Sequence, residues 1–233
     1  ILIVGFYFYD AIEYLVRVEF QRAAREDVGI TFNEPHESSA RYSVEGLPGV
    51  LRAEPFRAVA ARLRFEHRSR RVGILGLSDE RDLRRIVDQN LRVIDLPPEG
   101  IVLSTSLAQI LGVSPGDTLT VEVLEGQRPV RPVVVAGTVE DLIGTSAYMD
   151  IHALNRLMRE GETISGAFLS VDSLVAPRLY SLLKRTPAVS GVNVREAMLQ
   201  SFRDTIARSL GISTGALIAF ACVIAFGIVY NGA

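Results

Sequence analysis

The chain has 233 residues, of which 48% are hydrophobic and 22% charged, with a formal net charge of −2. This length is enough to bury one sizeable core or two small ones. The near-neutral charge gives no electrostatic reason to expect nucleic acid as a partner, and a single cysteine, Cys222, excludes an internal disulfide. A mean hydropathy of +0.24 beside an ordinary charged fraction indicates that the apolar residues are concentrated in part of the chain.

The N-terminal segment begins with the apolar and aromatic run ILIVGFYFY, Ile1 to Tyr9. This run is too short to cross a membrane by itself, and a signal-peptide remnant or a core strand are alternative interpretations. Apolar residues at helical spacing follow it, and tyrosines occupy the place of an aromatic belt at a membrane surface. We therefore predict that residues 1–25 are the end of a membrane helix that runs into an amphipathic stalk.

The first part of the middle region alternates short strand and helix patterns. The expected elements are a strand at 27–32, a breaker at 33–35, a short helix at 38–45, a turn at 47–49, a half-buried strand at 59–66, its partner strand at 70–76 after a turn at 67–69, and a helix at 79–88. In the last of these, the spacing of Leu83, Ile86 and Val87 predicts that their side chains face inward.

The second part of the middle region continues in the same way. The expected elements are strands at 100–103, 119–123, 133–139 and 167–171, helices at 104–111, 150–159 and 174–184, and turns at 115–117 and 125–127. Gly112 follows the first of these helices, where a left-handed C′ residue is common. Because hairpins and crossovers coexist, we predict an α+β domain rather than a doubly wound sheet.

The C-terminal end carries the strongest membrane signal. Leu210–Tyr230 contains no charged residue and matches the roughly 20 residues that a helix needs to cross a bilayer. Its glycines are costly in a soluble helix but common where membrane helices pack closely. Before it, apolar residues recur about every four positions with charges between them. We predict one long helix from about Val194 to Tyr230, a second stalk followed by a second span; a buried helix of a larger soluble domain is the alternative.

Residues for nucleotide or metal chemistry do not form a motif. The only lysine, Lys184, lies between leucine and arginine, so the chain carries no Walker A motif and any use of ATP belongs to a partner. His36, His67 and His152 are far apart, and none has a second histidine or cysteine at metal-ligand spacing. We therefore predict a protein that is not an enzyme, with no catalytic, cofactor-binding or metal-binding residues and no cofactor.

Other patterns have a plain explanation beside a functional one. Residues 211–215 read G-x-S-x-G around Ser213, but a nucleophile elbow needs a strand before its serine, whereas a helical stalk is expected here. Asp10 and Glu13 lie one helical turn apart and either bind a cation, pair with Arg17 or form a solvated face. Five arginines on the predicted hairpin suit anionic head groups, an acidic partner or a solvated strand face: Arg62, Arg64, Arg68, Arg70 and Arg71.

The order of these segments resembles that of an FtsX/MacB-type ABC transporter permease. The stretch LGVSPGDTLTVEV (111–123), followed by VVVAGTVED (133–141), is similar to the part of the family's periplasmic core domain that reads "lgv.pGD.v.v" and then "..vvGvv.d". TSAYMDIHALNRLM (145–158) resembles the segment that follows, and VIAFGIVYNGA (223–233) resembles the family's second span. The chain begins at Ile1 rather than Met and stops at Ala233 directly after an apolar run, so both ends look cut from a longer polypeptide. The absence of the family's remaining membrane helices agrees with this expectation.

The resemblance implies a type VII ABC system, in which a separate cytoplasmic ATPase dimerises under ATP and two permease copies carry that motion across the bilayer. It implies residues 1–25 as the end of transmembrane helix 1 and a stalk, 26–193 as an extracytoplasmic α+β domain, and 194–233 as a stalk and transmembrane helix 2. The protein is then expected to be multi-pass in the cell (inner) membrane, with its central domain in the periplasm or extracellular space. Its movement would export or extract a lipid, lipoprotein, peptide or drug.

The partners implied are a cytoplasmic ABC ATPase subunit, a second permease copy, membrane lipids and a periplasmic adaptor or lipoprotein, with no nucleic acid. Two other functions are open at this point. A ligand-sensing domain of a two-span signalling receptor predicts a ligand pocket in the α/β core and a kinase or methyl-accepting region after Ala233. A membrane-bound hydrolase using Ser213 predicts loss of activity when that serine is replaced by alanine.

Overall fold

The computed structural model describes residues 24–79, 81–88, 92–140, 144–201 and 204. The chain divides into two compact units, and residues 24–195 belong to one of them. The predicted spans, together with Asp10, Glu13, Arg17 and Ser213, lie outside the described residues. Within the described residues, no helix is both long and apolar enough to cross a membrane.

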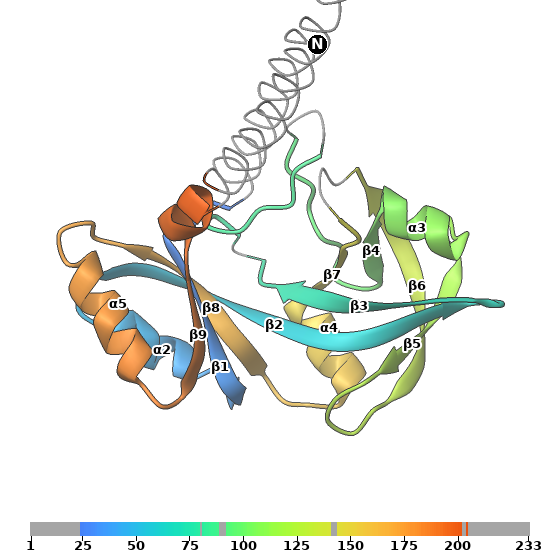
Figure 1. The fold of residues 1–233 in the computed structure, drawn as a ribbon. Coiled ribbons are helices and arrows are strands. Elements are labelled where there is room, and N and C mark those ends of the chain that lie inside the picture. Colours follow the sequence, from blue (N-terminus) through green and yellow to red (C-terminus); the bar gives the residue numbers. More distant parts are fainter. Residues whose placement is uncertain (1–23, 80, 89–91, 141–143, 202–203, 205–233) are drawn as a thin grey trace, which may run out of the picture. The chain divides into compact units, whose positions relative to one another are not determined.

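Four strands of one part of the domain form an antiparallel sheet, and two helices pack on one face of this sheet (Figure 1). The strands are β1 (Val28–Glu37), β2 (Val50–Phe65), β8 (Thr163–Val171) and β9 (Val189–Val194), adjacent in the order β2-β8-β1-β9. Helix α2 (Ala40–Glu45) follows β1, and α5 (Ala176–Arg185) follows β8. This β-α-β-β-α-β order is that of a ferredoxin-like split βαβ unit, and we call this part the ferredoxin-like half.

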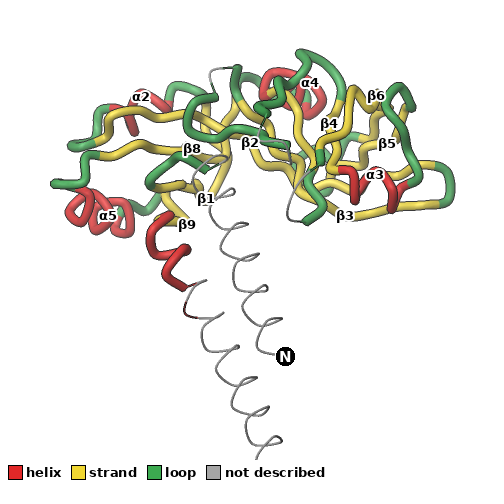
Figure 2. Tube along the Cα trace, turned by 90° about the horizontal axis from the view of Figure 1, so that it is seen from above, coloured by secondary structure: helices red, strands yellow, loops and turns green. Residues whose placement is uncertain are grey.

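A small barrel is inserted between β2 and β8, and Figure 2 shows its helices α3 and α4 beside its strands. Its elements are β3 (Arg68–Leu77), β4 (Ile101–Ser104), α3 (Thr105–Leu111), β5 (Thr118–Val123), β6 (Val130–Val139), β7 (Ala147–Asp150) and α4 (Ile151–Met158). The pairings run β2–β3–β7–β4–β6–β5 and return to β2, so the sheet closes on itself. Leu63, Ile74 and Leu103 are fully buried in its core.

Strand β2 belongs to both halves. Its first residues, Val50–Phe56, pair with β8 of the ferredoxin-like half, and Phe56–Phe65 pair with β3 of the barrel. Because 16 consecutive residues form one strand, the two halves share a continuous backbone element rather than a loop.

Several local predictions are confirmed. The predicted hairpin forms, but Phe65 pairs with Arg68, so its turn is residues 66–67 instead of 67–69 and its second strand begins two residues earlier than expected. Gly112 ends α3 in the left-handed conformation with φ 74°, and its N–H donates to the carbonyl of Ala108. Asp150 caps α4 by accepting hydrogen bonds from the N–H groups of the second and third residues after it. The α+β class is confirmed for the described domain.

The predicted helix at 79–88 is wrong. The described residues of this stretch form no helix, although Leu83, Ile86 and Val87 are buried as predicted. The N–H groups of Asp82 and Leu83 donate to the carboxylate of Glu54, at 2.9 Å each. Tertiary hydrogen bonds therefore take the backbone groups that a first helical turn would present.

Two predictions about strands also need correction, and two strands were missed. Residues 33–35 do not break the first strand: they lie inside β1, where the register with β8 shifts between Thr31 and His36. The strand expected at 59–66 begins at Val50, because the charges at Glu54 and Arg57 interrupt its apolar alternation although both side chains are buried. Strands β7 and β9 were not expected as strands.

Candidate functional site

Both ends of the described domain leave one sheet side by side. Strand β1, which begins the domain, pairs antiparallel with β9, which ends it, and Val28 lies opposite Val194. Residues 195–201 are helical, so β9 passes directly into a helix. A displacement of either chain end would therefore act on the same pair of strands.

The carboxylate of Asp27 joins both ends to a third strand. One oxygen accepts a hydrogen bond from the Arg195 guanidinium at 3.0 Å, and the other accepts the Val171 N–H at 2.9 Å and the Ser170 hydroxyl at 3.3 Å. The backbone of Asp27 also donates to Leu169 and accepts from Arg195. Five bonds thus hold the start of β1 to β8 and to the end of β9.

The segment that was expected to be helical ties β2 to the start of the chain. The Glu54 side chain in β2 is buried and holds the N–H groups of Asp82 and Leu83, while the Leu83 carbonyl accepts the Arg25 N–H at 2.8 Å. Arg52 adds ion pairs to Asp82 at 2.7 Å and to Glu54 at 3.0 Å. We call residues 24–27, 82–85 and 195 the junction.

Two carboxyl groups of the junction have shifted pKa values of opposite sign. Burial raises the pKa of Glu26, although the Arg84 guanidinium 2.9 Å away opposes the shift. The second oxygen of Glu26 is buried and has no hydrogen-bond partner among the described residues. The hydrogen bond from Arg85, followed by the charge of Arg52, lowers the pKa of Asp82.

A buried arginine locks the barrel onto the ferredoxin-like half. The Arg57 side chain in β2 is 2% exposed, and one of its terminal nitrogens donates to the hydroxyl of Ser165 in β8 at 2.7 Å. The other pairs with Glu125 in the β5–β6 turn at 3.1 Å and with Glu160 after α4 at 3.0 Å. We call these four residues the Arg57 cluster.

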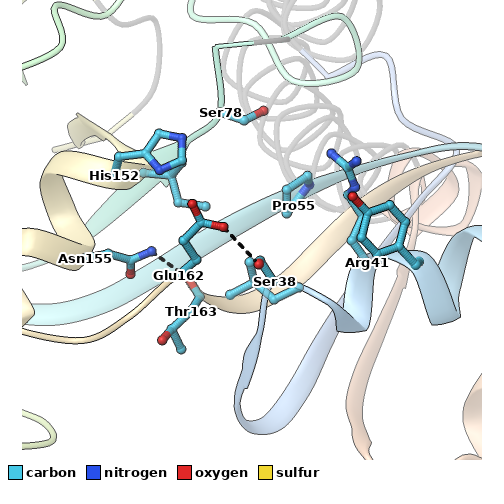
Figure 3. Close-up of a pocket in the computed structure, with 11 residues that line it drawn as sticks. Ser38, Arg41, Pro55, Ser78, His152, Asn155, Glu162 and Thr163 are labelled. Carbon is cyan, nitrogen blue, oxygen red and sulfur yellow. Dashed lines mark hydrogen bonds between the residues drawn. The ribbon is translucent and has the colours of Figure 1, made fainter.

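A cleft of about 170 Å³ lies where the two halves meet, lined by residues of α2, β2, α4 and the start of β8 (Figure 3). The Ser38 hydroxyl donates to the Glu162 carboxylate at 3.1 Å, and the Asn155 amide donates to the Thr163 carbonyl at 3.1 Å. Within the described residues, no hydrogen bond joins the His152 imidazole to Ser38 or Glu162, so a base-activated nucleophile is not assembled.

The residues singled out by sequence lie apart. His36 packs edge-on against Phe32, His67 is in the β2–β3 turn, and His152 is on α4. The described residues hold no group of three or more His, Cys, Asp or Glu placed for a metal ion. On the β2–β3 hairpin, two of the five predicted arginines share one carboxylate: Arg62 and Arg64 pair with Glu122 at 3.3 and 3.0 Å.

Sequence reasoning missed the junction and the Arg57 cluster. Asp27 and Arg195 are 168 positions apart, so no local pattern joins them. A signal was present in β2, where Glu54 and Arg57 stand among small and apolar residues that are buried, such as Ala53 and Val59. Charges within an apolar strand pattern can indicate buried, paired side chains.

Comparisons with known proteins found similar solved structures. No protein-family profile matches the chain, and no curated protein matches it. It is similar to the periplasmic region of MacB from Actinobacillus actinomycetemcomitans, with 12% identity, a TM-score of 0.48, and 81% of this chain and 97% of that chain covered. It is also similar to the extracellular domain of the ABC-type transporter YknZ from Gram-positive bacteria, with 14% identity, a TM-score of 0.45, and 72% and 98% covered. Both of these solved structures are extracytoplasmic domains.

Proposed function

We propose that the chain is part of a permease subunit of an FtsX/MacB-like ABC transporter, and that its described domain moves in response to ATP hydrolysis by a separate cytoplasmic ATPase. One observation carries this proposal: β1 and β9 are paired neighbours, and Asp27 bonds the start of one to the end of the other. If the two predicted stalks continue from these ends, one movement reaches the domain through one pair of strands.

The proposed transmission of movement from the chain ends depends on rigid elements of the domain. Hydrogen-bonded strands and their ion pairs transmit a rigid-body displacement better than loops do. From Asp27 the bonds lead to β8, and through the Glu54 carboxylate they lead to β2, which continues into the barrel. The domain is thus suited to move as a body on its two chain ends, without catalytic residues of its own.

The proposal includes location and partners. The domain lies in the periplasm or extracellular space, between two spans of a multi-pass protein in the cell membrane. Its partners are a cytoplasmic ABC ATPase, a second permease copy, membrane lipids, and an adaptor or lipoprotein. The substrate class is a lipid, lipoprotein, peptide or drug.

The first test is purification of the full-length parent from native membranes, with mass spectrometry of the proteins that accompany it. Recovery of an ABC ATPase whose hydrolysis depends on this subunit is the expected result. Hydrogen–deuterium exchange of the purified complex with and without ATP then measures whether the movement reaches the domain. A domain that moves as a body keeps its internal hydrogen bonds, so exchange is expected to change at the junction, where the chain ends join the sheet. A complex in which ATP leaves this exchange unchanged would refute the proposed coupling.

A matched pair of variants locates the coupling. Asp27→Ala removes the carboxylate that bonds Arg195 and Val171, so we expect the ATP-dependent change in exchange to be lost while the ATPase still co-purifies. Asp79→Ala removes an exposed carboxylate that makes no ion pair within the described residues, and the change should persist. An ATP-dependent change in exchange that is the same in both variants would show that Asp27 does not transmit the movement.

A second candidate is the sensor domain, favoured by the cleft between the halves. Its lining includes the polar side chains of Ser38, His152 and Glu162, which suit a small polar ligand. A kinase-type region in the parent and no ATPase partner would establish this function in place of the permease.

A further inference from the structure

One edge of strand β6 is paired with another strand along only part of its length. Residues Val130–Val134 pair with β5, whereas pairing with β4 on the other side begins at Val135. The first half of β6 therefore has no strand neighbour on its second edge among the described strands. An edge of this kind presents backbone groups that can pair with another chain.

The outward face of the same stretch is apolar. Val130 is 61% exposed and Val134 is 49% exposed, and Pro132 and Ala136 between and beyond them are exposed on the same face. Outward positions of an antiparallel sheet are normally polar. A contiguous exposed apolar stripe marks an interaction site more often than a single exposed side chain does.

A groove of about 510 Å³ follows this edge and separates it from helix α4. Its apolar lining includes Val133 and Val134 of β6 together with Met149, Ala153 and Leu157. The groove therefore offers apolar surface beside an unpaired strand edge, which is the arrangement that accepts an extended segment as an added strand.

The charged groups of the groove favour an anionic occupant. Arg131 and Arg156 both line it, and neither forms an ion pair within the described residues; Arg156 donates only to the Pro98 carbonyl, at 3.2 Å. The Nε atom of Arg131 is buried and has no hydrogen-bond partner there. Glu99 is the only carboxylate of the lining, so two guanidinium groups face one acid. An acceptor for a buried guanidinium N–H is best supplied by a carboxylate.

We propose that this groove binds an extended segment of a partner protein in which apolar and acidic residues alternate. Along β6, the apolar stripe and Arg131 lie on opposite faces of the strand. A strand added at this edge would continue the stripe with its apolar side chains and turn a carboxylate toward Arg131. Pro132 has no N–H and limits indiscriminate pairing along the edge, so recognition depends on the side chains. The argument uses only the groove and is independent of the proposed transport function.

The test measures binding of a fluorescent acetyl-Val-Glu-Val-Glu-Val amide peptide to the full chain in detergent, by fluorescence anisotropy. We expect saturable binding, and at least tenfold weaker binding of the same peptide with lysine in place of glutamate. Arg131→Gln/Arg156→Gln should weaken binding of the acidic peptide at least tenfold. The matched control is Arg70→Gln/Arg71→Gln, which removes two exposed hairpin arginines that also lack ion pairs within the described residues and should change binding less than twofold.

Other outcomes overturn the proposal. Absence of binding would refute the site outright, and equal weakening by the two double variants would leave only general electrostatic attraction. Displacement of the peptide by phosphatidylglycerol vesicles would identify a lipid surface. Self-association that Val134→Asp abolishes would identify a second copy of the chain as the occupant. If the groove variant fails to fold, as read from its melting temperature, the lysine peptide on the unaltered chain still decides the matter.

Discussion

Replacing Arg57 by alanine tests whether the two halves are locked by a buried charge. The Arg57 side chain is 2% exposed, and its partners Glu125 and Glu160 are 37% and 28% exposed. Removing one partner of a fully buried ion pair costs about 3–5 kcal/mol. Here the two glutamates can regain water, so we expect a smaller loss than this scale, about 2–3 kcal/mol. For a domain of this size each kcal/mol lowers the melting temperature by about 2–4 °C, which gives a drop of about 4–12 °C.

The assay is thermal unfolding of the full chain in detergent, followed by circular dichroism. Arg57→Met removes the guanidinium group but retains most of the apolar stem of the side chain, so it should lose less stability than Arg57→Ala. Arg70→Ala removes an exposed arginine and should shift the melting temperature by no more than about 2 °C, as most surface substitutions do. An Arg57→Ala melting curve that matches that of Arg70→Ala would refute the lock.

The remaining predictions concern β8, the junction and the paired chain ends. Gly166→Ala should destabilise by about 1–3 kcal/mol or more, since its Cβ would meet the carbonyl oxygen of Ile30 and overpack β8, and thermal unfolding measures this. Burial raises the pKa of Glu26 in the folded state above its ordinary value of 4.5. The free energy of unfolding therefore decreases as the pH rises from below 4.5 through the pKa of the folded state. Glu26→Gln removes this loss, so its melting temperature relative to the unaltered chain should be higher at about pH 7 than at about pH 4. Cysteines at Gly29 and Asn193, which lie opposite each other in β1 and β9, should form a disulfide, seen as a shift on non-reducing gels.

Each of these predictions has a matched control. Gly137→Ala in β6 adds a Cβ with no atom within 4 Å, so a melting temperature lowered as much as by Gly166→Ala would contradict the packing argument. The cysteine pairs are made in a Cys222→Ser background, and cysteines at Gly29 and Val192 should not link, because a one-residue slip turns the side chains to opposite faces. A relative stability of Glu26→Gln that is the same at both pH values would show that the group does not change its proton affinity on folding.

Elements with a strong burial period could be predicted from sequence. In β5, Leu119, Val121 and Val123 are buried, and their alternation with polar residues indicated the strand. Helix α3 was delimited by Ser104, whose hydroxyl accepts the Leu107 N–H, and by the glycine that follows it. In both cases the residues that determine the element lie within it or directly beside it.

The remaining features depend on distant residues. The helix expected at 79–88 had suitable spacing, but Glu54 in another element takes two of its N–H groups. Closure of the barrel depends on β3 pairing with β7, where Ile74 lies opposite Ala147, a separation that no local pattern encodes. The junction has the same character, because Asp27 and Arg195 meet only after β1 and β9 have paired.

The insertion of the barrel within the ferredoxin-like half gives the two clusters different roles. Asp27 lies where the chain ends meet the sheet, so its loss weakens the bonds of the ends to each other and to β8. Arg57 lies beyond that point, between β2, β8 and the β5–β6 turn, so its loss weakens only the hold on the barrel. A domain that moves as one body requires both sets of bonds, and the groove beside β6 belongs to the barrel. A partner bound in that groove would therefore receive a movement of the chain ends through β2 and its pairing with β8, through the Arg57 cluster, and through the hydrogen bond from Asn155 in α4 to Thr163 in β8.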